Sequence, residues 1–396
     1  MAKSNLLVAQ SGGPSMVINQ SLVGVVLAAR GNPDVGKIYG ALHGIQGILD
    51  EQFVDLRKET PANLEAVAAT PSSALGSVRR KPTPEDCAAI FKVLQKNKIK
   101  WFFYIGGNDS AETANIINEY AQDAGEDLVC FHVPKTIDND LRENDHTPGF
   151  GSAARFVACA LMGDDLDNRA LGGVKIDIIM GRHAGFLTAA SALARVNKND
   201  GPHLIYLPER PFSTTQFVKD VKDAVKTYGR CVVAVSEGIA DKKGNLIASQ
   251  FIHEVDSHGN AQLSGSGALG DALANLIKDK AGIKRVRADT FGYLQRSFPG
   301  IASSVDQEEA RKAGIAAFEA AASGKYKSGS IAIRRKKGRK YAVSFDVVPL
   351  KNVAKETRSM PDAFIAENGH DVTKAFIEYA APIVGDLPVK AMLKGL

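Results

Sequence analysis

The sequence predicts an α/β protein with two domains, each a mainly parallel sheet flanked by helices. Three observations lead to this fold class. The chain has 396 residues, about two to three times the usual domain length. Strand-length apolar runs alternate with helix-length segments, a pattern typical of right-handed βαβ units. Several of these runs also end in polar or glycine-rich loops. Ligands of parallel sheets bind beyond the carboxyl ends of the strands, so we look for the chemistry there.

The expected strands share a short apolar run between glycine, proline or polar residues. In chain order they are residues 6–10, 37–41, 101–105, 128–133, 175–180, 203–207, 231–236 and 286–290. Two further β-like stretches, 330–333 and 341–348, enclose a basic run. Helix-length segments separate most of the strands, which favours parallel pairing.

Two changes in composition are the expected crossings between domains. One is the loop 143–151, which contains proline and glycine, and the other is the polar, glycine-rich segment 257–267. The sequence contains no internal repeat and no long linker. We therefore expect the two domains to share a substantial cleft, a common place for substrates.

Composition excludes several classes of protein. With 44% apolar and 23% charged residues, 37 Gly and 16 Pro, the chain is an ordinary globular protein rather than a disordered, collagenous or coiled-coil one. No apolar run approaches the roughly 18–20 residues that span a bilayer, and the first residues soon turn polar. These features predict a cytoplasmic protein with no membrane partner. The four cysteines, Cys87, Cys130, Cys159 and Cys231, lie too far apart for a zinc or redox motif and are expected to be buried thiols.

The formal net charge of +5 comes from one segment. Residues 334–340 contain six lysines and arginines, with Gly338 among them and no interleaved aromatic residue. Because this run lies between two β-like stretches, we interpret it as the solvated tip of a hairpin. A nucleic-acid partner is therefore not expected.

Two motifs resemble nucleotide-binding loops without their context. GSGALG at 265–270 matches the dinucleotide pattern, but no apolar strand precedes it. GNPDVGKI at 31–38 resembles a P-loop, but Ile38 stands where Ser or Thr binds magnesium, and a strand follows instead of a helix. Because the sequence has no GxSxG and no HExxH, those hydrolase mechanisms also lose support.

Two glycine pairs follow predicted strands. In SGGPSMVIN, residues 11–19, Gly12 and Gly13 would let the backbone approach an anion at a helix start. GGNDS, residues 106–110, has the same arrangement and predicts a second phosphate cradle. Each loop taken alone is also consistent with a simple tight turn, and Asp109 with a helix cap.

The strongest local signal is the loop PKTIDND, residues 134–140, directly after a predicted strand. It contains Lys135, Asp138 and Asp140. One carboxylate can accept a proton from a hydroxyl, the other can bind magnesium, and the ammonium can neutralise a transferring phosphoryl group. The loop therefore favours phosphoryl transfer over the alternative, a solvated polar turn.

Seven separated motifs then occur in one order. They are SGGP at Ser11, LGSVR at 75–79, GGNDS, PKTIDND, MGRHAG at 180–185, VSEG at 235–238 and RADTFGYLQR at 287–296. In these motifs the chain resembles the phosphofructokinase family, specifically its pyrophosphate-dependent branch. The resemblance implies an active site in the cleft between two domains, and subunits that complete one another's sugar-phosphate sites, hence at least a homodimer. It implies a phosphoryl-donor domain of residues 1–144 plus 267–302 and a sugar-phosphate domain of 145–266 plus 303–396.

The resemblance also implies roles for residues at matching positions. Asp138 corresponds to the general base that takes the proton from the 1-hydroxyl of fructose 6-phosphate, with Lys135 and Arg182 as further catalytic residues. The sugar-binding positions are Thr136, Asp138, Met180, Gly181, Arg182 and Glu237, and those around the 6-phosphate are Arg287, Tyr293 and Arg296. The donor-binding positions are Gly12, Gly13, Arg79, Gly107, Asn108, Asp109, Ser110 and Lys135. The Mg²⁺ positions are Asn108 and Asp140, and Arg287 is expected from the neighbouring subunit.

Two positions indicate which donor is used. Members that use ATP carry glycine where this chain has Asp109 and Lys135. A carboxylate at 109 would clash with, and repel, the α-phosphate of ATP. The ammonium at 135 would reach the phosphoryl group of a short donor. We therefore expect reversible, magnesium-dependent transfer from pyrophosphate to fructose 6-phosphate, giving fructose 1,6-bisphosphate and phosphate in glycolysis or gluconeogenesis.

The chain departs from the family pattern at three places. Asn108 replaces an aspartate, Tyr293 a histidine, and Gly173 the subunit-crossing arginine; Lys175, two residues on, is a candidate substitute. Two alternatives stay open: an ATP-dependent 6-phosphofructokinase, and a catalytically weak, sugar-phosphate-sensing regulatory subunit. Also open are the preference for fructose 6-phosphate over sedoheptulose 7-phosphate, the oligomer size, allosteric control, and the roles of 239–266 and 324–396.

Overall fold

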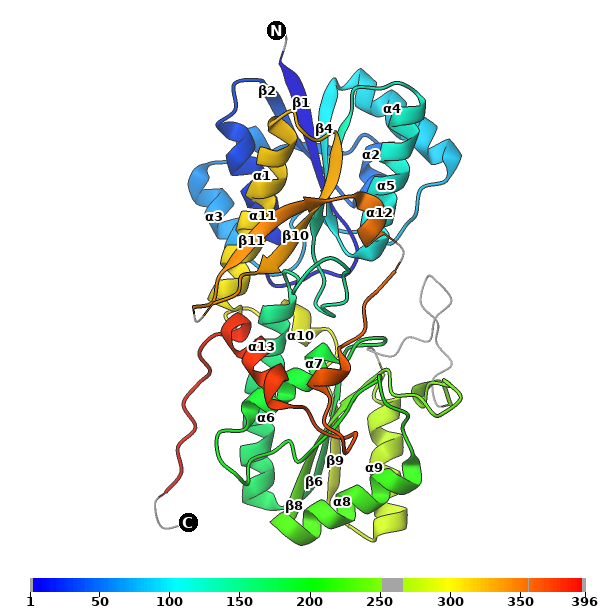
Figure 1. Ribbon diagram of the computed structural model, residues 1–396, viewed down its shortest axis with the longest axis vertical. Helices are drawn as coiled ribbons and strands as arrows, with labels where there is room; N and C mark the ends of the chain where they lie inside the picture. Colours follow the sequence, from blue (N-terminus) through cyan, green and yellow to red (C-terminus); the bar gives the residue numbers. More distant parts are fainter. Residues whose placement is uncertain (1–2, 251–265, 339, 355, 394–396) are drawn as a thin grey trace. The chain divides into compact units, whose positions relative to one another are not determined.

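The computed structural model describes residues 3–250, 266–338, 340–354 and 356–393. Its contacts divide the chain into two compact units (Figure 1). Unit 1 contains Met1–Phe150 and Ser304–Arg358, and unit 2 contains Gly151–Ser303 and Ser359–Leu396. The predicted α/β class, with helices flanking mainly parallel sheets, is confirmed.

The predicted assignment of the returning segments to the two domains was wrong. Residues 267–302 belong to unit 2 and not with 1–144, and 304–358 belong to unit 1 and not with 145–266. The reason is strand pairing: Val286–Thr290 pairs with a strand of unit 2, and Ser328–Arg335 with a strand of unit 1. The chain crosses after Phe150, close to the predicted loop, whereas most of the other predicted crossing, 257–267, lies outside the described residues.

Unit 1 is built on a seven-stranded sheet of order β11-β10-β5-β4-β1-β2-β3. The strands are β1 Ser4–Gln10, β2 Val35–Ala41, β3 Phe53–Asp55, β4 Ile99–Gly106, β5 Val129–Pro134, β10 Ser328–Arg335 and β11 Val343–Val348. The edge strands β3 and β11 pair antiparallel, and the other pairs are parallel. All the strands predicted here are present, and β3, of only three residues, was missed.

Helices cover both faces of this sheet. They are α1 Ile18–Arg30, α2 Ile45–Leu49, α3 Pro61–Ala69, α4 Pro84–Lys96, α5 Asn108–Asp123, α11 Ser304–Ala322, α12 Leu350–Val353 and the short 3₁₀ helix η1 Leu56–Lys58. Leu6 packs in the core beside α1 and α11, and Leu7 in the core on the opposite face beside α4 and α5. Burial on both faces explains why the central strands read as continuous apolar runs. The helices α1 and α11 approach closely, because a Cβ on Gly24 would lie 2.3 Å from the carbonyl oxygen of Arg311.

Unit 2 is built on a four-stranded parallel sheet of order β7-β8-β6-β9. Its strands are β6 Gly173–Ile179, β7 Leu204–Tyr206, β8 Arg230–Ser236 and β9 Val286–Thr290. Its helices are α6 Phe150–Leu171, α7 Phe186–Ala190, α8 Thr214–Tyr228, α9 Ala268–Ala281, α10 Leu294–Ser297 and α13 Lys374–Val384, with the 3₁₀ turns η2 Ser191–Ala194, η3 Ala248–Gln250 and η5 Asp362–Phe364. The four predicted strands of this unit are all present.

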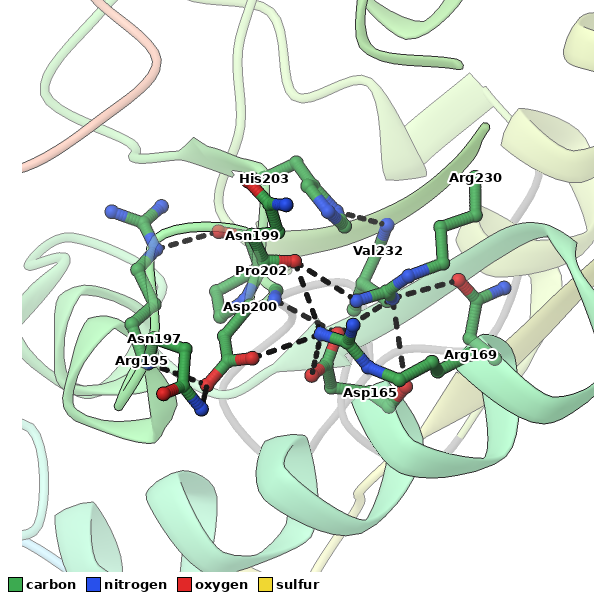
Figure 2. A network of polar contacts seen from close by, with 12 residues as sticks. Asp165, Arg169, Arg195, Asn197, Asn199, Asp200, Pro202, His203, Arg230 and Val232 are labelled. Carbon is green, nitrogen blue, oxygen red and sulfur yellow. Dashed lines mark hydrogen bonds and ion pairs between the residues drawn. The ribbon is translucent and has the colours of Figure 1, made fainter. Parts of the chain in front are cut away.

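A network of buried charges ties α6 to β8 and to the loop before β7 (Figure 2). Arg230 lies 2.6 Å from Asp165, and Arg169 lies 2.9 Å from Asp200. The ammonium of Lys390 joins the same two carboxylates from the C-terminal segment. Burial raises the pKa of Asp165, but its bonds to Lys390 and Arg230 outweigh burial and hold that pKa below its ordinary value. These charges are buried because they are paired.

The predicted hairpin is present, but only part of the basic run lies at its tip: Arg334 and Arg335 are the last residues of β10, paired with Ser344 and Val343 of β11, and Arg339 is outside the described residues. Arg334 pairs with Glu143 at 2.6 Å and Arg335 with Asp145 at 3.1 Å. Part of the positive charge is therefore neutralised within unit 1.

Two other predictions concern the thiols and the membrane. Cys87, Cys130 and Cys231 are buried free thiols, whereas Cys159 is only half-buried. Within the part of the chain that the structure describes, none of the helices combines the length and the apolar character that crossing a membrane requires.

Candidate active site

The loops after β1, β4 and β5 lie next to one another at the carboxyl edge of the unit 1 sheet. The strands pair in that order, and backbone bonds continue past their ends. The amide of Ser11 donates to the carbonyl of Ile105 at 2.9 Å, and the amide of Lys135 to that of Gly106 at 2.9 Å. The three loops singled out in the sequence therefore form one group.

Lys135 is the cationic centre of this group. Its side chain is buried, and its ammonium donates to the carbonyl of Gly13. Gly12 has φ of 75°, and a Cβ built there would lie 3.5 Å from the ammonium nitrogen. A side chain at 12 would be strained at this φ and would lie against the ammonium, so glycine lets the turn pass close to Lys135 without covering its ammonium with a side chain.

Arg79 lies beside the same turn. The carbonyl of the preceding residue, Val78, accepts a bond from the amide of Gly12 at 3.3 Å and one from the hydroxyl of Ser11 at 3.3 Å. Arg79 itself is exposed. The structure thus brings a second positive charge, 66 residues downstream of Gly13 and within the segment between β3 and β4, to the first glycine pair.

The second glycine pair caps α5. Gly107 is its N-cap, and Asn108 and Asp109 are its first residues. The side chain of Asp109 is 65% exposed and lies 3.4 Å from the ammonium of Lys81. Ser110 differs from the expectation of a donor ligand, because its hydroxyl is buried against Gly106, where a Cβ would lie 2.0 Å from it. Its backbone amide donates to the carbonyl of Gly107.

The loop after β5 holds its acidic residues by internal hydrogen bonds. The hydroxyl of Thr136 donates to Asp140 at 3.1 Å, and the amide of Asp138 donates to that hydroxyl oxygen at 3.2 Å. Asn139, between them, has a φ of 60°, which asparagine tolerates better than most residues. Burial raises the pKa of Asp140, and its bond from Thr136 opposes this.

Arg358 holds this loop from a distant part of the chain. Its guanidinium donates to the carbonyls of Asn139 at 2.9 Å, Asn144 at 2.6 Å and Asp145 at 2.7 Å. Its amide donates to the carbonyl of Asp140 at 2.8 Å. The sequence analysis missed Arg358, because an isolated arginine more than 200 residues downstream carries no local signal.

His132 supports the end of β4 from β5. It is fully buried, and its Nε2 donates to the carbonyl of Gly106 at 2.9 Å while its Nδ1 accepts from the hydroxyl of Ser330 at 2.8 Å. Burial lowers the pKa of His132 to about 4, and the charge of Lys135 adds to this effect. The imidazole is therefore neutral at neutral pH and orients the turn before Gly107.

This burial predicts a loss of stability in acid. The unfolded histidine has a pKa near 6.5, so the folded state, with a pKa of about 4, binds the proton less well. The stabilisation is complete above pH 6.5 and is lost as the pH falls towards 4, by roughly 3 kcal/mol. Urea unfolding of the wild type and of His132→Phe at several pH values checks this. Equal pH slopes for the two proteins would contradict it.

In unit 2, the loops after β6 and β8 meet. The amide of Gly181 donates to the carboxylate of Glu237 at 3.5 Å, and the hydroxyl of Ser236 donates to the carbonyl of Gly181 at 2.7 Å. Gly181 has φ of 135° and Glu237 is buried. A Cβ on Gly238 would lie 2.1 Å from the carbonyl oxygen of Arg182, so glycine is required for this close approach. Met180, Gly181, Arg182 and Glu237 therefore lie in adjoining loops.

The segment after β9 joins this group through a residue that the sequence analysis missed. The buried side chain of Gln295 accepts a bond from the amide of Met180 at 3.2 Å, which ties α10 to the end of β6. Tyr293 and Arg296 lie together, with the guanidinium carbon 4.5 Å from the ring centroid. This distance is typical of a cation–π contact.

Arg287 stands apart from this group within the chain. It is exposed near the amino end of β9, opposite Lys175 in the register, whereas Tyr293 follows the carboxyl end. Lys175, the candidate substitute for the arginine missing at Gly173, has its ammonium among the carboxylates of Asp164, Asp177 and Asp289.

Comparison with known proteins agrees with this geometry. Residues 5–321 match the phosphofructokinase family. The chain is 57% identical to the pyrophosphate–fructose 6-phosphate 1-phosphotransferase of Rhodospirillum rubrum, over 97% of this chain and 95% of the relative. It is 38% identical to the protein of that name from Xanthomonas campestris, over 100% of this chain and 95% of the relative.

A solved structure gives the same result. The pyrophosphate-dependent phosphofructokinase of Marinobacter aquaeolei superimposes with a TM-score of 0.87 at 34% identity, covering 99% of this chain and 94% of that one. The resemblance stated from seven motifs is confirmed over nearly the whole length, and this chain belongs to the phosphofructokinase family.

Proposed function

We propose that this chain transfers a phosphoryl group reversibly from pyrophosphate to the 1-hydroxyl of fructose 6-phosphate, giving fructose 1,6-bisphosphate and phosphate. Relatives that carry the name of this reaction match nearly the whole chain. The observation that carries the proposal is the buried ammonium of Lys135 at the Gly12–Gly13 turn, three residues before Asp138. A fixed cation in a glycine-lined turn suits a compact, highly charged donor.

The chemistry requires positioning and charge neutralisation rather than a covalent intermediate. Asp138 accepts the proton of the 1-hydroxyl as that oxygen attacks phosphorus. Lys135 neutralises charge on the transferring oxygens, and Arg79 and Arg182 contribute further positive charge. The backbone amides of Gly13, Gly107, Asn108 and Asp109 would bind the rest of the donor.

The residues also fit a magnesium ion. The carboxylate of Asp140 and the amide oxygen of Asn108 are hard oxygen donors of the type Mg²⁺ prefers, and water would supply the remaining ligands. When bound, the ion would neutralise charge on the phosphoryl oxygens. Burial disfavours the ionised form of Asp140 and so raises its pKa. A bound cation would oppose this effect and favour the ionised carboxylate.

On the sugar side, Thr136, Met180, Gly181 and Glu237 would hold the hydroxyl groups, and Tyr293 and Arg296 the 6-phosphate. The contact between Tyr293 and Arg296 presents a guanidinium and a hydroxyl together, a suitable pair for a phosphate. Arg287, which lies apart within the chain, would come from a neighbouring subunit of at least a dimer. We place the reaction in cytoplasmic glycolysis or gluconeogenesis.

Initial rates with a panel of substrates test the proposal. Pyrophosphate and ATP are compared as donors, and fructose 6-phosphate and sedoheptulose 7-phosphate as acceptors, each with and without Mg²⁺. We expect turnover with pyrophosphate, fructose 6-phosphate and Mg²⁺, and little with ATP. Robust turnover with ATP alone would contradict the donor assignment. Binding of the sugar phosphate without product from either donor would instead indicate a regulatory subunit.

Arg358→Ala tests whether the loop after β5 must be held in place. The variant loses three hydrogen bonds from a charged donor, so we expect kcat to fall at least tenfold and unfolding free energy by roughly 2–4 kcal/mol. Arg57→Ala is a matched control, because Arg57 also bonds two carbonyls of unit 1, Gly36 at 2.7 Å and Val35 at 3.0 Å, away from these loops. A similar fall in kcat for both variants would refute a positioning role.

A further inference from the structure

Three carboxylates from different elements meet on one face of the unit 2 sheet. Asp177 on β6 lies directly opposite Asp289 on β9, and Asp164 comes from α6. One oxygen from each residue lies within 4.8 Å of the other two. Because paired strands present facing residues on the same side, the sheet itself brings two of the three together.

Asp177 is a buried carboxylate without a cation or N–H donor at hydrogen-bond distance among the described residues. Its side chain is fully buried, and within the described residues neither carboxylate oxygen accepts a hydrogen bond from an N–H donor; the side chain that lies against it is another carboxyl, Asp164. The nearest cation, the ammonium of Lys175, is 3.7 Å away, beyond hydrogen-bond distance. That ammonium instead contacts Asp289 and lies 3.4 Å from Asp164. A buried carboxylate without donors is costly.

The charges in the cluster do not balance either. In the part of the chain that the structure describes, Asp164, Asp177 and Asp289 face the single ammonium of Lys175, which leaves two negative charges uncompensated when all three carboxyls are ionised. Burial, reinforced by the charge of Asp164, raises the pKa of Asp177 well above its ordinary value. A carboxyl in these surroundings either keeps a proton or faces a cation.

We propose that Asp164, Asp177 and Asp289 form a binding site for a hard divalent cation, of the Ca²⁺ class. Ca²⁺ binds oxygen at about 2.3–2.6 Å, so opposite ligands stand roughly 5 Å apart, whereas those of Mg²⁺, at about 2.0–2.1 Å, stand roughly 4 Å apart. Oxygens that lie within 4.8 Å of one another can all ligate one ion with Ca²⁺–oxygen distances. Asp289 is 61% exposed, so water can enter to complete the shell.

The site is separate from the magnesium ligands of the proposed function. Those ligands, Asn108 and Asp140, belong to unit 1, and the cluster belongs to unit 2. Cation binding would join β6, β9 and α6 and would displace the ammonium of Lys175 from Asp289. The inference does not rest on the proposed function, because its test measures ion binding rather than turnover.

Calcium titration calorimetry on the full chain, freed of metal by a chelator, tests the site. We expect the wild type and Asp140→Asn to bind one Ca²⁺ per chain with equal affinity. Asp177→Asn and Asp289→Asn should bind at least tenfold more weakly. Asp167→Asn, which removes an exposed carboxylate of the same helix as Asp164, is the matched control and should bind like the wild type.

Lys175→Met is expected to strengthen Ca²⁺ binding, whereas the aspartate variants are expected to weaken it. Removing the competing ammonium should tighten Ca²⁺ binding at least threefold. Absence of Ca²⁺ binding in Asp140→Asn, or unchanged binding in Asp289→Asn, would overturn the proposal. Because the Asp289 side chain is mostly exposed, its variant keeps the test decisive even where Asp177→Asn does not fold. A wild type that binds no Ca²⁺ while Asp177→Asn gains resistance to urea would show that the carboxyl is simply protonated.

Discussion

Replacing Asp138 by asparagine is expected to lower kcat for the pyrophosphate reaction by roughly 10³-fold or more while changing either KM little. The amide has nearly the shape of the carboxylate, so the loop and its bond from the amide of residue 138 to Thr136 are retained. What is lost is the group that accepts the proton of the sugar hydroxyl. Steady-state rates in both directions, with calorimetric binding of fructose 6-phosphate, measure the two effects separately.

Asp145→Asn is the control for this variant. Asp145 follows in the same segment, and its carboxylate contacts His146 at 2.8 Å and Arg335 at 3.1 Å. We expect that variant to keep most of its kcat. If Asp138→Asn kept more than a tenth of the wild-type kcat, the general base would have to be another residue.

Replacing both Asp109 and Lys135 by glycine is expected to reverse the preference between donors. Loss of the buried ammonium should lower kcat/KM for pyrophosphate by roughly 10²–10³-fold. Removal of the carboxylate at the start of α5 should let ATP bind and be used, because both its volume and its charge oppose a nucleotide phosphate there. The ratio of kcat/KM for the two donors is the measurement.

The single variants divide this effect. Lys135→Gly should account for most of the loss with pyrophosphate, and Asp109→Gly for most of the gain with ATP. Glu112→Gln is the matched control. The ammonium of Lys81 lies 2.6 Å from the carboxylate of Glu112 and 3.4 Å from that of Asp109. This variant therefore also removes an ion pair of Lys81, but it leaves the side chain at position 109 in place. A folded double variant that still rejects ATP would show that Asp109 is not the barrier to the nucleotide.

Local sequence patterns predicted most of the strands and the main loops. The central strands are buried on both faces, so each is a continuous apolar run that can be recognised without its neighbours. The loops at 11–19, 106–110 and 134–140 carry their glycines, lysine and carboxylates within a few residues of a strand end. Since neighbouring parallel strands end at the same edge, their convergence also followed from the pattern.

Pairing between distant segments could not be predicted in this way. Residues 286–290 and 330–333 were both expected to be strands, and nothing in either segment indicates its partner; backbone hydrogen bonds place the first beside β6 and the second beside β5. This choice reversed the expected assignment of the returning segments. Strand β3 is too short to show a period at all.

What the sequence alone determined is therefore the α/β class, the strand-end loops and the family chemistry that Lys135 and Asp138 suggest. The tertiary structure alone decided which unit each returning segment joins, that Arg358 and Gln295 hold the loops, and that Asp177 meets Asp164 and Asp289. The physical reason is the distance along the sequence over which each feature is determined. A turn or an apolar run depends on neighbouring residues, whereas a buried polar contact depends on a partner that is distant in sequence and comes near only when the chain folds.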